Sequence, residues 1–241
     1  MALLQAQGVT KRYGGLVANN DVTLAIEPGE IRGLIGPNGA GKTTLVNLIT
    51  GVEVPDAGEI RLQGQSLLGL APHQVARRGL LRSFQVTRLF GNLTVQENLL
   101  TPFLAQGGRY ADGAAQAETL LALTTLDRLR DQPAKGLSGG QRALLQVACG
   151  FMLPRLACYV LDEPFAGINP VIKDAIIELI VEANRSRGLT FLVVSHEMTV
   201  MRRLCHRITV MMEGRIAVEG TLDEVARAPE VIAGYLGKAW T

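Results

Sequence analysis

A glycine-rich segment constrains the fold of this chain more than any other feature. Residues 36–43 read GPNGAGKT and match the pattern GxxxxGK[ST]. The segment directly follows the apolar run Ile31–Ile35, which is typical of a buried strand, and it directly precedes a helical pattern over 42–50 that ends at Gly51. A strand, a glycine loop and a helix in this order predict one βα unit of an α/β fold.

The same segment has the chemistry of a phosphate-binding loop. Glycines let consecutive backbone N–H groups curl around phosphate oxygens, and the N-terminus of the following helix adds its dipole. Lys42 supplies a point charge, and Thr43 offers a hydroxyl ligand to Mg²⁺. We therefore predict nucleotide binding by Gly36, Pro37, Asn38, Gly39, Ala40, Gly41, Lys42, Thr43 and Thr44.

Strand and helix patterns alternate along much of the chain. The runs 158–161 and 191–194 are continuous and apolar, as strands buried on both faces of a parallel sheet are, and 170–187 reads as a helix ending at Gly188. Two kinds of region depart from this alternation. Residues 94–150 predict an inserted helical subdomain, whereas 3–30 and 208–220 predict strands with turns at 14–15, 28–29 and 213–214. We expect one composite domain over 1–241, ending in a helical tail over 221–241.

Composition and charge exclude several classes of protein. The 24 Lys and Arg against 22 Asp and Glu leave a net charge of +2, too balanced for general attraction to a nucleic-acid backbone. Three cysteines without CxxC spacing, Cys149, Cys158 and Cys205, predict no disulfide framework or zinc site. With no uninterrupted run of about 20 apolar residues and no leader pattern, the sequence indicates a soluble cytoplasmic chain.

Two adjacent acids end the predicted strand at 158–162. Asp162 is placed to hold Mg²⁺ through its water shell, and Glu163 to polarise an attacking water. Neighbouring residues of a strand point to opposite sides, so we expect the two acids to take different tasks. The alternative is a solvated strand end, which the nearby phosphate loop makes less favoured.

A third motif, LSGGQ at 137–141, precedes a predicted helix over 141–151 and would aim a serine hydroxyl and backbone N–H groups at an anion. With it, the sequence resembles the ATP-binding cassette family across essentially all 241 residues: GPNGAGKTT resembles the phosphate loop, LSGGQ the signature, and LDEP the magnesium and base motif.

The resemblance implies a P-loop NTPase core with a mostly parallel sheet and flanking helices, plus an antiparallel β subdomain and the inserted helical subdomain. It also implies that ATP and Mg²⁺ are bound, and that the signature of one copy completes the site of a second. The signature residues are Ser138, Gly139, Gly140 and Gln141.

The resemblance implies further roles for single residues. Tyr13, in KRYGG, is similar to the aromatic residue that stacks on adenine, although strand packing is the alternative. Gln85, in SFQ, is similar to the glutamine that reaches Mg²⁺ and the attacking water and couples the core to the helical insertion. His196, after the apolar run FLVVS, matches the histidine that contacts the γ-phosphate. Glu163, His196 and Gln85 are thus the expected catalytic residues, whereas His73 and His206 match no motif.

One position departs from the family pattern. The loop after Glu163 usually carries an Asp where this chain has Asn169. An amide keeps hydrogen bonding across the expected dimer but loses the negative charge. The substitution leaves open how tightly the two sites of the dimer are coupled.

Three stretches, at 83–100, 165–170 and 228–237, resemble the ATPases of importers for branched-chain or other hydrophobic amino acids. The regular LSGGQ differs from that branch, and ATPases of urea importers and lipopolysaccharide exporters stay open. The expected partners are a second ATPase copy or a paralogue, transmembrane permease subunits and a substrate-binding protein. Attachment to permeases would hold the chain at the inner face of the cell membrane.

Other nucleotide-binding classes fit less well. A GTPase would show a guanine-reading NKxD motif and would lack LSGGQ, and ribosome or DNA ATPases of the family would carry a second cassette or a long coiled coil. A non-catalytic nucleotide sensor is the remaining alternative. It is disfavoured because all four hydrolytic positions are intact.

Overall fold

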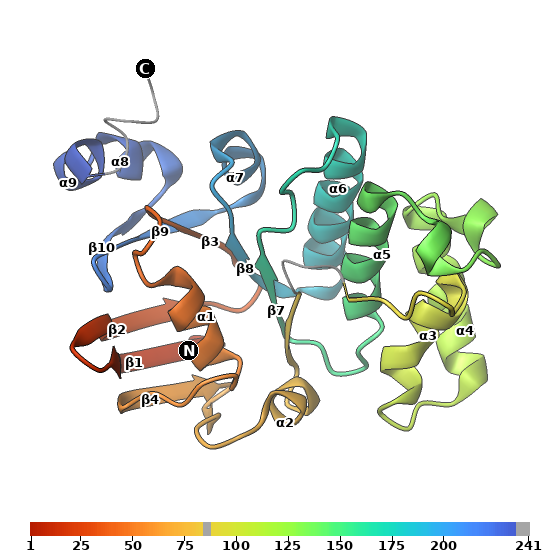
Figure 1. The fold of residues 1–241 in the computed structure, drawn as a ribbon, viewed down its shortest axis with the longest axis horizontal. Coiled ribbons are helices and arrows are strands. Elements are labelled where there is room, and N and C mark those ends of the chain that lie inside the picture. Colours follow the sequence, from red (N-terminus) through yellow and green to blue (C-terminus); the bar gives the residue numbers. More distant parts are fainter. Residues whose placement is uncertain (84–87, 235–241) are drawn as a thin grey trace.

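Two β-sheets and a set of helices build the chain in the computed structural model, which describes residues 1–83 and 88–234 (Figure 1). The smaller sheet is antiparallel in the order β2-β1-β4-β5. The larger has the order β10-β9-β3-β8-β7-β6 and is parallel except for β10. The strands are β1 (Leu4–Tyr13), β2 (Leu16–Ile26), β3 (Ile31–Ile35), β4 (Ala57–Leu62), β5 (Gln65–Ser66), β6 (Leu80–Arg82), β7 (Cys158–Asp162), β8 (Thr190–Val194), β9 (Arg207–Met212) and β10 (Arg215–Gly220).

The expected α/β fold is confirmed, as are the strands and turns predicted at 3–30, at 208–220 and in the parallel sheet. Strands β4, β5 and β6 are additional, because the stretches that form them are short and carry no clear strand period. β6, for example, has three residues and pairs in parallel with β7.

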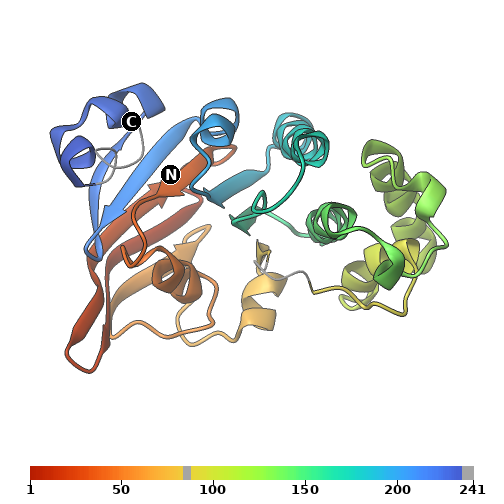
Figure 2. The ribbon, with the colours of Figure 1, turned by 45° about the horizontal axis from the view of Figure 1, so that its top comes forward.

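Helices cover the parallel sheet and form the opposite end of the molecule from the antiparallel sheet (Figures 1 and 2). The region predicted as helical, 94–150, contains α3, α4, α5 and two short 3-10 helices. Among the described residues, no helix combines the length and the apolar character needed to cross a bilayer. The helices are α1 (Lys42–Ile49), α2 (Pro72–Arg77), α3 (Val95–Leu104), α4 (Tyr110–Leu123), α5 (Gly139–Phe151), α6 (Pro170–Arg187), α7 (Met198–Leu204), α8 (Leu222–Arg227) and α9 (Pro229–Gly234), with 3-10 turns at Asp127–Leu129 and Ala134–Gly136.

The parallel sheet is buried on both faces, and the alternation of side chains along each strand divides the core in two. One face packs against the helices that include α5 and α6, and the other packs against α1 and the antiparallel sheet. This arrangement explains why the predicted strands are continuously apolar instead of alternating. In β7 and β8 the first face carries Tyr159, Leu161, Phe191 and Val193, and the second carries Cys158, Val160, Leu192 and Val194.

A buried arginine on β3 ties the two sheets together. The guanidinium of Arg32 forms ion pairs with Glu30 and with Glu219 of β10. It also donates to the Thr209 hydroxyl of β9 at 2.9 Å and to the Ala25 carbonyl of β2 at 3.1 Å. Only 3% of Arg32 is exposed, so the charge depends on these partners instead of on water.

We expect Arg32→Met to lower the free energy of unfolding by about 3–5 kcal/mol, because it leaves the buried carboxylate of Glu30 and the partly exposed one of Glu219 without their cation. Urea unfolding followed by circular dichroism measures this loss. The matched control is Arg61→Met, whose ion pair with Glu59 is much more exposed than those of Arg32 and should contribute less than about 1 kcal/mol. Equal losses in the two variants would contradict the tying role of Arg32.

Candidate nucleotide-binding site

The loop between β3 and α1 takes a shape that two of its glycines make possible. Gly36 has a φ of 147° and Gly41 a φ of 95°, in the region that favours glycine. A Cβ at Gly36 would lie 2.1 Å from the Met211 carbonyl oxygen, and one at Gly41 would lie 2.4 Å from that of Ala18. Both contacts are with backbone atoms that cannot rotate away, so side chains are excluded at both positions.

The neighbouring strands hold this loop by hydrogen bonds. The N–H of Gly214, in the turn between β9 and β10, donates to the Ala40 carbonyl at 3.1 Å. The buried Asn19 side chain of β2 donates to the Gly41 carbonyl at 3.2 Å. The sequence indicated the turn at 213–214 but not its contact with the loop, because a hairpin turn looks alike wherever it packs.

The start of α1 is arranged to receive an anion. Its N-cap residue, Gly41, has no side chain with which to cap the first N–H groups, so these groups are available to a ligand. The Lys42 side chain extends back along the loop, and its ammonium donates to the carbonyls of Gly36 and Pro37 at 2.7 and 2.9 Å. Burial lowers the pKa of Lys42, while the negative charges of Glu163 and Asp162 oppose this shift.

A cavity of about 620 Å³ opens over the loop, within the usual size range of small-molecule sites. Segments far apart in the sequence line it: the end of β1, the start of β2, the loop and α1, the ends of β7 and β8, and the β9–β10 turn. The structure therefore brings together most of the residues predicted within one chain. The predicted residues in its lining are Tyr13, Asn38, Gly39, Ala40, Gly41, Lys42, Thr43, Thr44, Asp162 and Glu163.

Asp162, the last residue of β7, is 6% exposed and is held by an unpredicted partner. Arg82 of β6 donates to its Oδ2 at 2.7 Å. The backbone N–H of Asp162 donates to the hydroxyl of Ser83 at 3.1 Å. The only signal for Arg82 in the sequence is a lone arginine at the edge of the SFQ segment, which does not reveal its pairing with a residue 80 positions later.

Glu163 differs from the expectation that it and Asp162 point to opposite sides. Strand β7 ends at Asp162, and Glu163 has a φ of 50°, a left-handed conformation uncommon for a residue with a side chain. This turn brings both carboxylates to the same cavity. Nδ1 of His196, just beyond β8, lies 3.1 Å from Oε1 and 3.0 Å from Oε2 of Glu163. Strained backbone of this kind concentrates at functional sites.

Tyr13 lines the cavity at the end of β1, with 44% of the residue exposed. Its hydroxyl donates to the carboxylate of Glu53, which raises the pKa of Tyr13. The ammonium of Lys11 lies 5.7 Å from the ring centroid. An exposed aromatic ring on the cavity wall fits the predicted stacking surface better than the alternative of strand packing.

The signature residues do not line this cavity. Ser138 is the N-cap of α5, and helix α5 begins at Gly139, earlier than predicted. The Ser138 hydroxyl accepts from the Gln141 N–H at 3.3 Å, and the Gln141 side chain accepts from the Ser138 N–H at 2.9 Å. This capping box fixes the helix N-terminus. Gln85, the remaining predicted catalytic residue, lies outside the described residues.

Asn169 has a local role that either Asn or Asp could fill. It is the N-cap of α6, and its Oδ1 accepts from the Ile172 N–H at 3.0 Å. Asn and Asp are about equally good N-caps, so the helix start tolerates either residue.

The donor set fits a Mg²⁺ ion that is bound together with phosphate. Thr43 and Asp162 supply one hydroxyl and one carboxylate to the same cavity. In the part of the chain that the structure describes, no three His, Cys, Asp or Glu side chains converge as a metal cage would require. Mg²⁺ commonly keeps several waters and binds through one or two protein ligands plus phosphate oxygens, so a sparse set is appropriate.

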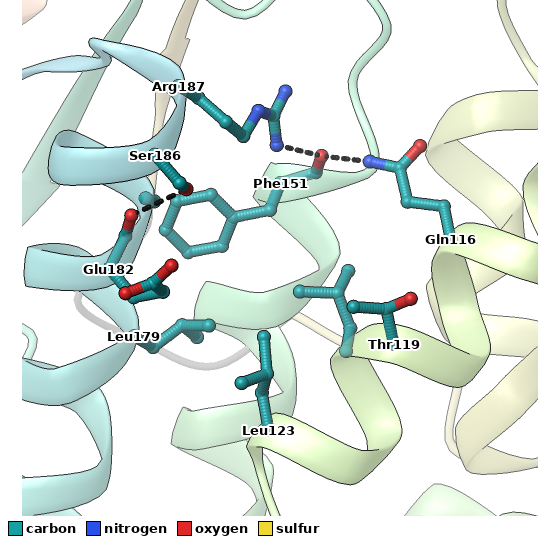
Figure 3. A pocket seen from close by; sticks show the side chains of 10 residues that line it. Gln116, Thr119, Leu123, Phe151, Leu179, Glu182, Ser186 and Arg187 are labelled. Carbon is teal, nitrogen blue, oxygen red and sulfur yellow. Dashed lines mark hydrogen bonds between the residues drawn. The ribbon is translucent and has the colours of Figure 1, made fainter.

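A second cavity, of about 490 Å³, lies between α4, α5 and α6 (Figure 3). Its polar groups are used to hold helix ends: Gln116 and Arg187 donate to the Phe151 carbonyl at 2.7 and 3.3 Å. Ser186 donates to the Glu182 carbonyl at 2.7 Å. The Gln116 and Arg187 contacts join the C-terminus of α5 to α4 and α6, and the Ser186 contact lies within α6, so we assign this cavity a structural role.

Known proteins resemble this chain in sequence and in fold. A family model described as ABC transporter matches residues 19–166. The chain is 39% identical to the high-affinity branched-chain amino acid transport ATP-binding protein LivG of Escherichia coli K12, over 98% of each chain. It is 35% identical to a probable branched-chain amino acid transport ATP-binding protein LivG of Archaeoglobus fulgidus, over 98% of this chain and 96% of the relative.

Solved structures agree. A nucleotide-free ATP-binding cassette from an ABC transporter superposes with a TM-score of 0.86 at 28% identity, over 98% of this chain and 99% of that one. A dimeric ATP-binding cassette in a post-hydrolysis state, bound to ADP and Pi, gives a TM-score of 0.80 at 25% identity, over 91% of this chain and 98% of that one. The chain therefore belongs to the ABC transporter family, as one of its ATP-binding and ATP-hydrolysing subunits.

Proposed function

We propose that this ATPase powers the import of branched-chain or other hydrophobic amino acids. The observation that carries the proposal is the near full-length likeness, at 35–39% identity, to proteins named as branched-chain amino acid transport ATP-binding proteins. In this proposal the chain works on the inner face of the membrane, attached to permease subunits, and a substrate-binding protein delivers the amino acid.

Within the site, each residue acts on ATP through its chemistry. The N–H groups of the loop and the ammonium of Lys42 bind the phosphates, which requires Lys42 to exchange its two carbonyl contacts for phosphate oxygens. Thr43 and Asp162 would hold Mg²⁺, which neutralises charge on the phosphates when it is bound. The Tyr13 ring would stack on the adenine.

Glu163 would accept the proton of the attacking water. His196 lies within hydrogen-bonding distance of this carboxylate and orients it. Gln85 would complete this group from the SFQ segment. The acid and the phosphate loop line one cavity, as is required of a general base that activates a water beside the γ-phosphate.

The signature would act in a second copy of the chain. Ser138 lies at the capped N-terminus of α5 and not in the cavity over Lys42. We infer that the N-terminus of α5 faces the phosphates bound by the partner, so that two copies enclose two ATP molecules. Closure of this dimer on ATP would move the permease subunits, and hydrolysis would release it.

We expect Glu163→Gln to keep ATP affinity and to lower the hydrolysis rate by about 10²- to 10⁴-fold, because the amide cannot accept the proton. Phosphate release measures the rate, and nucleotide titration measures the affinity. The control is Glu178→Gln, on the exposed side of α6. Near-normal hydrolysis by Glu163→Gln would exclude Glu163 as the base.

We expect a chain that carries Asn38→Cys and Ser138→Cys, in the Glu163→Gln background, to form disulfide-linked dimers only with ATP and Mg²⁺. Burial raises the pKa of Cys149, Cys158 and Cys205 to about 12, so these native thiols compete poorly for the oxidant. Non-reducing electrophoresis separates linked dimers from single chains.

The control for this crosslink replaces Asn38→Cys by Asn92→Cys, at an exposed position of the helical region. It should give no ATP-dependent dimer. A link within one chain, or none with ATP bound, would contradict a site shared between copies.

The proposed substrate class is tested by uptake into cells of the source organism. Deletion of the encoding gene should lower the uptake of radiolabelled leucine, isoleucine and valine, and the unmodified gene should restore it, whereas the Glu163→Gln form should not. Urea uptake is the comparison. Loss of urea uptake with normal leucine uptake would replace the amino-acid proposal by the urea alternative.

A further inference from the structure

A continuous chain of hydrogen bonds joins two walls of the nucleotide cavity. It begins at Tyr13, whose hydroxyl donates to one carboxylate oxygen of Glu53. Asn47 of α1 donates to the other oxygen of Glu53 at 2.7 Å. Arg82 of β6 donates to the Asn47 amide oxygen at 2.6 Å and to Asp162 Oδ2 at 2.7 Å. Five side chains thus connect the predicted base-stacking residue to the predicted Mg²⁺ ligand.

Only the two end residues of this series of hydrogen bonds line the cavity. Tyr13 and Asp162 contribute to the cavity wall, whereas the middle residues Asn47, Glu53 and Arg82 do not. None of the three is fully exposed, so water competes only partly for these hydrogen bonds. A ligand in the cavity can therefore contact Tyr13 and Asp162 directly, and it can affect the three middle residues only through these two.

Each middle link has a fixed direction. The Asn47 amide donates at one end and accepts at the other, so it cannot serve both neighbours after a rotation. The backbone N–H of Glu53 also donates to the Asn47 carbonyl at 3.2 Å, which fixes the spacing of the pair. Arg82 Nε is buried without a hydrogen-bond partner, so Arg82 is held by its two terminal nitrogens. A shift at one link therefore changes the geometry of the next.

We propose that Asn47, Glu53 and Arg82 are positioning residues that couple the base of the nucleotide, at Tyr13, to the metal-binding carboxylate of Asp162. The proposal rests on the ATP and Mg²⁺ roles given under the proposed function. A base stacked on Tyr13 fixes the ring and its hydroxyl. The hydroxyl orients Glu53, and Asn47 and Arg82 transmit this orientation to Asp162, so metal affinity becomes sensitive to a base on the other side of the cavity.

This coupling is measured as the affinity of the protein for Mn²⁺, which replaces Mg²⁺ and is detected by electron paramagnetic resonance. The Mn²⁺ affinity is determined once for the protein bound to a non-hydrolysable ATP analogue and once for the protein bound to inorganic triphosphate, which has no base. Tyr13→Phe keeps the ring and removes only the hydroxyl at the start of the chain. We expect it to weaken Mn²⁺ binding by about 3- to 10-fold with the ATP analogue, a usual coupling within one hydrogen-bond network, and to leave it unchanged with triphosphate.

Asn47→Ala cuts the chain in the middle and should weaken Mn²⁺ binding with the ATP analogue by a similar factor. The double variant Asn47→Ala with Tyr13→Phe should bind Mn²⁺ no more weakly than either single variant, because a series of hydrogen bonds that is already broken at one link cannot transmit a change from the other. Asn92→Ala is the matched control, since Asn92 is an exposed asparagine whose side chain accepts a hydrogen bond from Lys135 and does not line the cavity. Arg82→Lys tests rescue, because lysine keeps the charge beside Asp162 without the fork that also reaches Asn47.

For Arg82→Lys we expect Mn²⁺ affinity with triphosphate to be retained and the effect of Tyr13→Phe to disappear. Equal weakening by Tyr13→Phe with both probes would indicate a general structural effect and overturn the coupling. Unchanged Mn²⁺ affinity in Tyr13→Phe and Asn47→Ala would overturn it as well. Failure of the unmodified protein to bind the ATP analogue would instead contradict the proposed function, so the two failures are distinguishable.

Discussion

The close approach of two backbones to the phosphate loop is the constraint on which the rest of the site depends. At Gly36 and Gly41 the loop leaves no space for a side chain, because the carbonyls of Met211 and Ala18 occupy it. These carbonyls belong to β9 and β2, which lie in different sheets. The loop can therefore take its shape only where the parallel sheet and the antiparallel sheet meet, and Arg32 holds the two sheets together at that junction.

The carboxylates of the site depend on the parallel sheet itself. Asp162 ends a strand that is buried on both faces, and Glu163 leaves that strand with a left-handed backbone. Such a conformation costs on the order of 1–3 kcal/mol and persists only where the surroundings enforce it. The Glu163 N–H donates to the Val194 carbonyl at 2.9 Å, so the neighbouring strand β8 helps to enforce it. As a result, two acids that would diverge along a strand share one cavity.

Local patterns in the sequence are sufficient to predict β3, β7 and β8 of the parallel sheet, the helix after the loop and the hairpin at 208–220. Each of these depends on side-chain periodicity and on glycine positions within about 20 residues. The contacts of Arg82 with Asp162 and of Tyr13 with Glu53 could not be predicted in this way. They join residues 80 and 40 positions apart, and nothing in the residue types alone selects one partner among many. The helix predicted over 141–151 begins two residues later than α5 does, because glycines weaken a helical pattern, whereas the capping box of Ser138 and Gln141 sets the observed start.

The helix starts assigned to the proposed ATP site differ in whether a side chain caps them. The first N–H groups of α1 are left without a side-chain cap and lie on the cavity, whereas Ser138 and Asn169 cap α5 and α6 with their own side chains. A capped helix start is rigid and keeps its direction, and it can still offer its dipole to an anion that another molecule presents. The uncapped N-terminus of α1 is thus suited to bind phosphate within its own chain. The capped N-terminus of α5 is suited to contact a phosphate that a second copy holds, because its shape is already fixed. This division accounts physically for an ATP site whose halves would come from two copies.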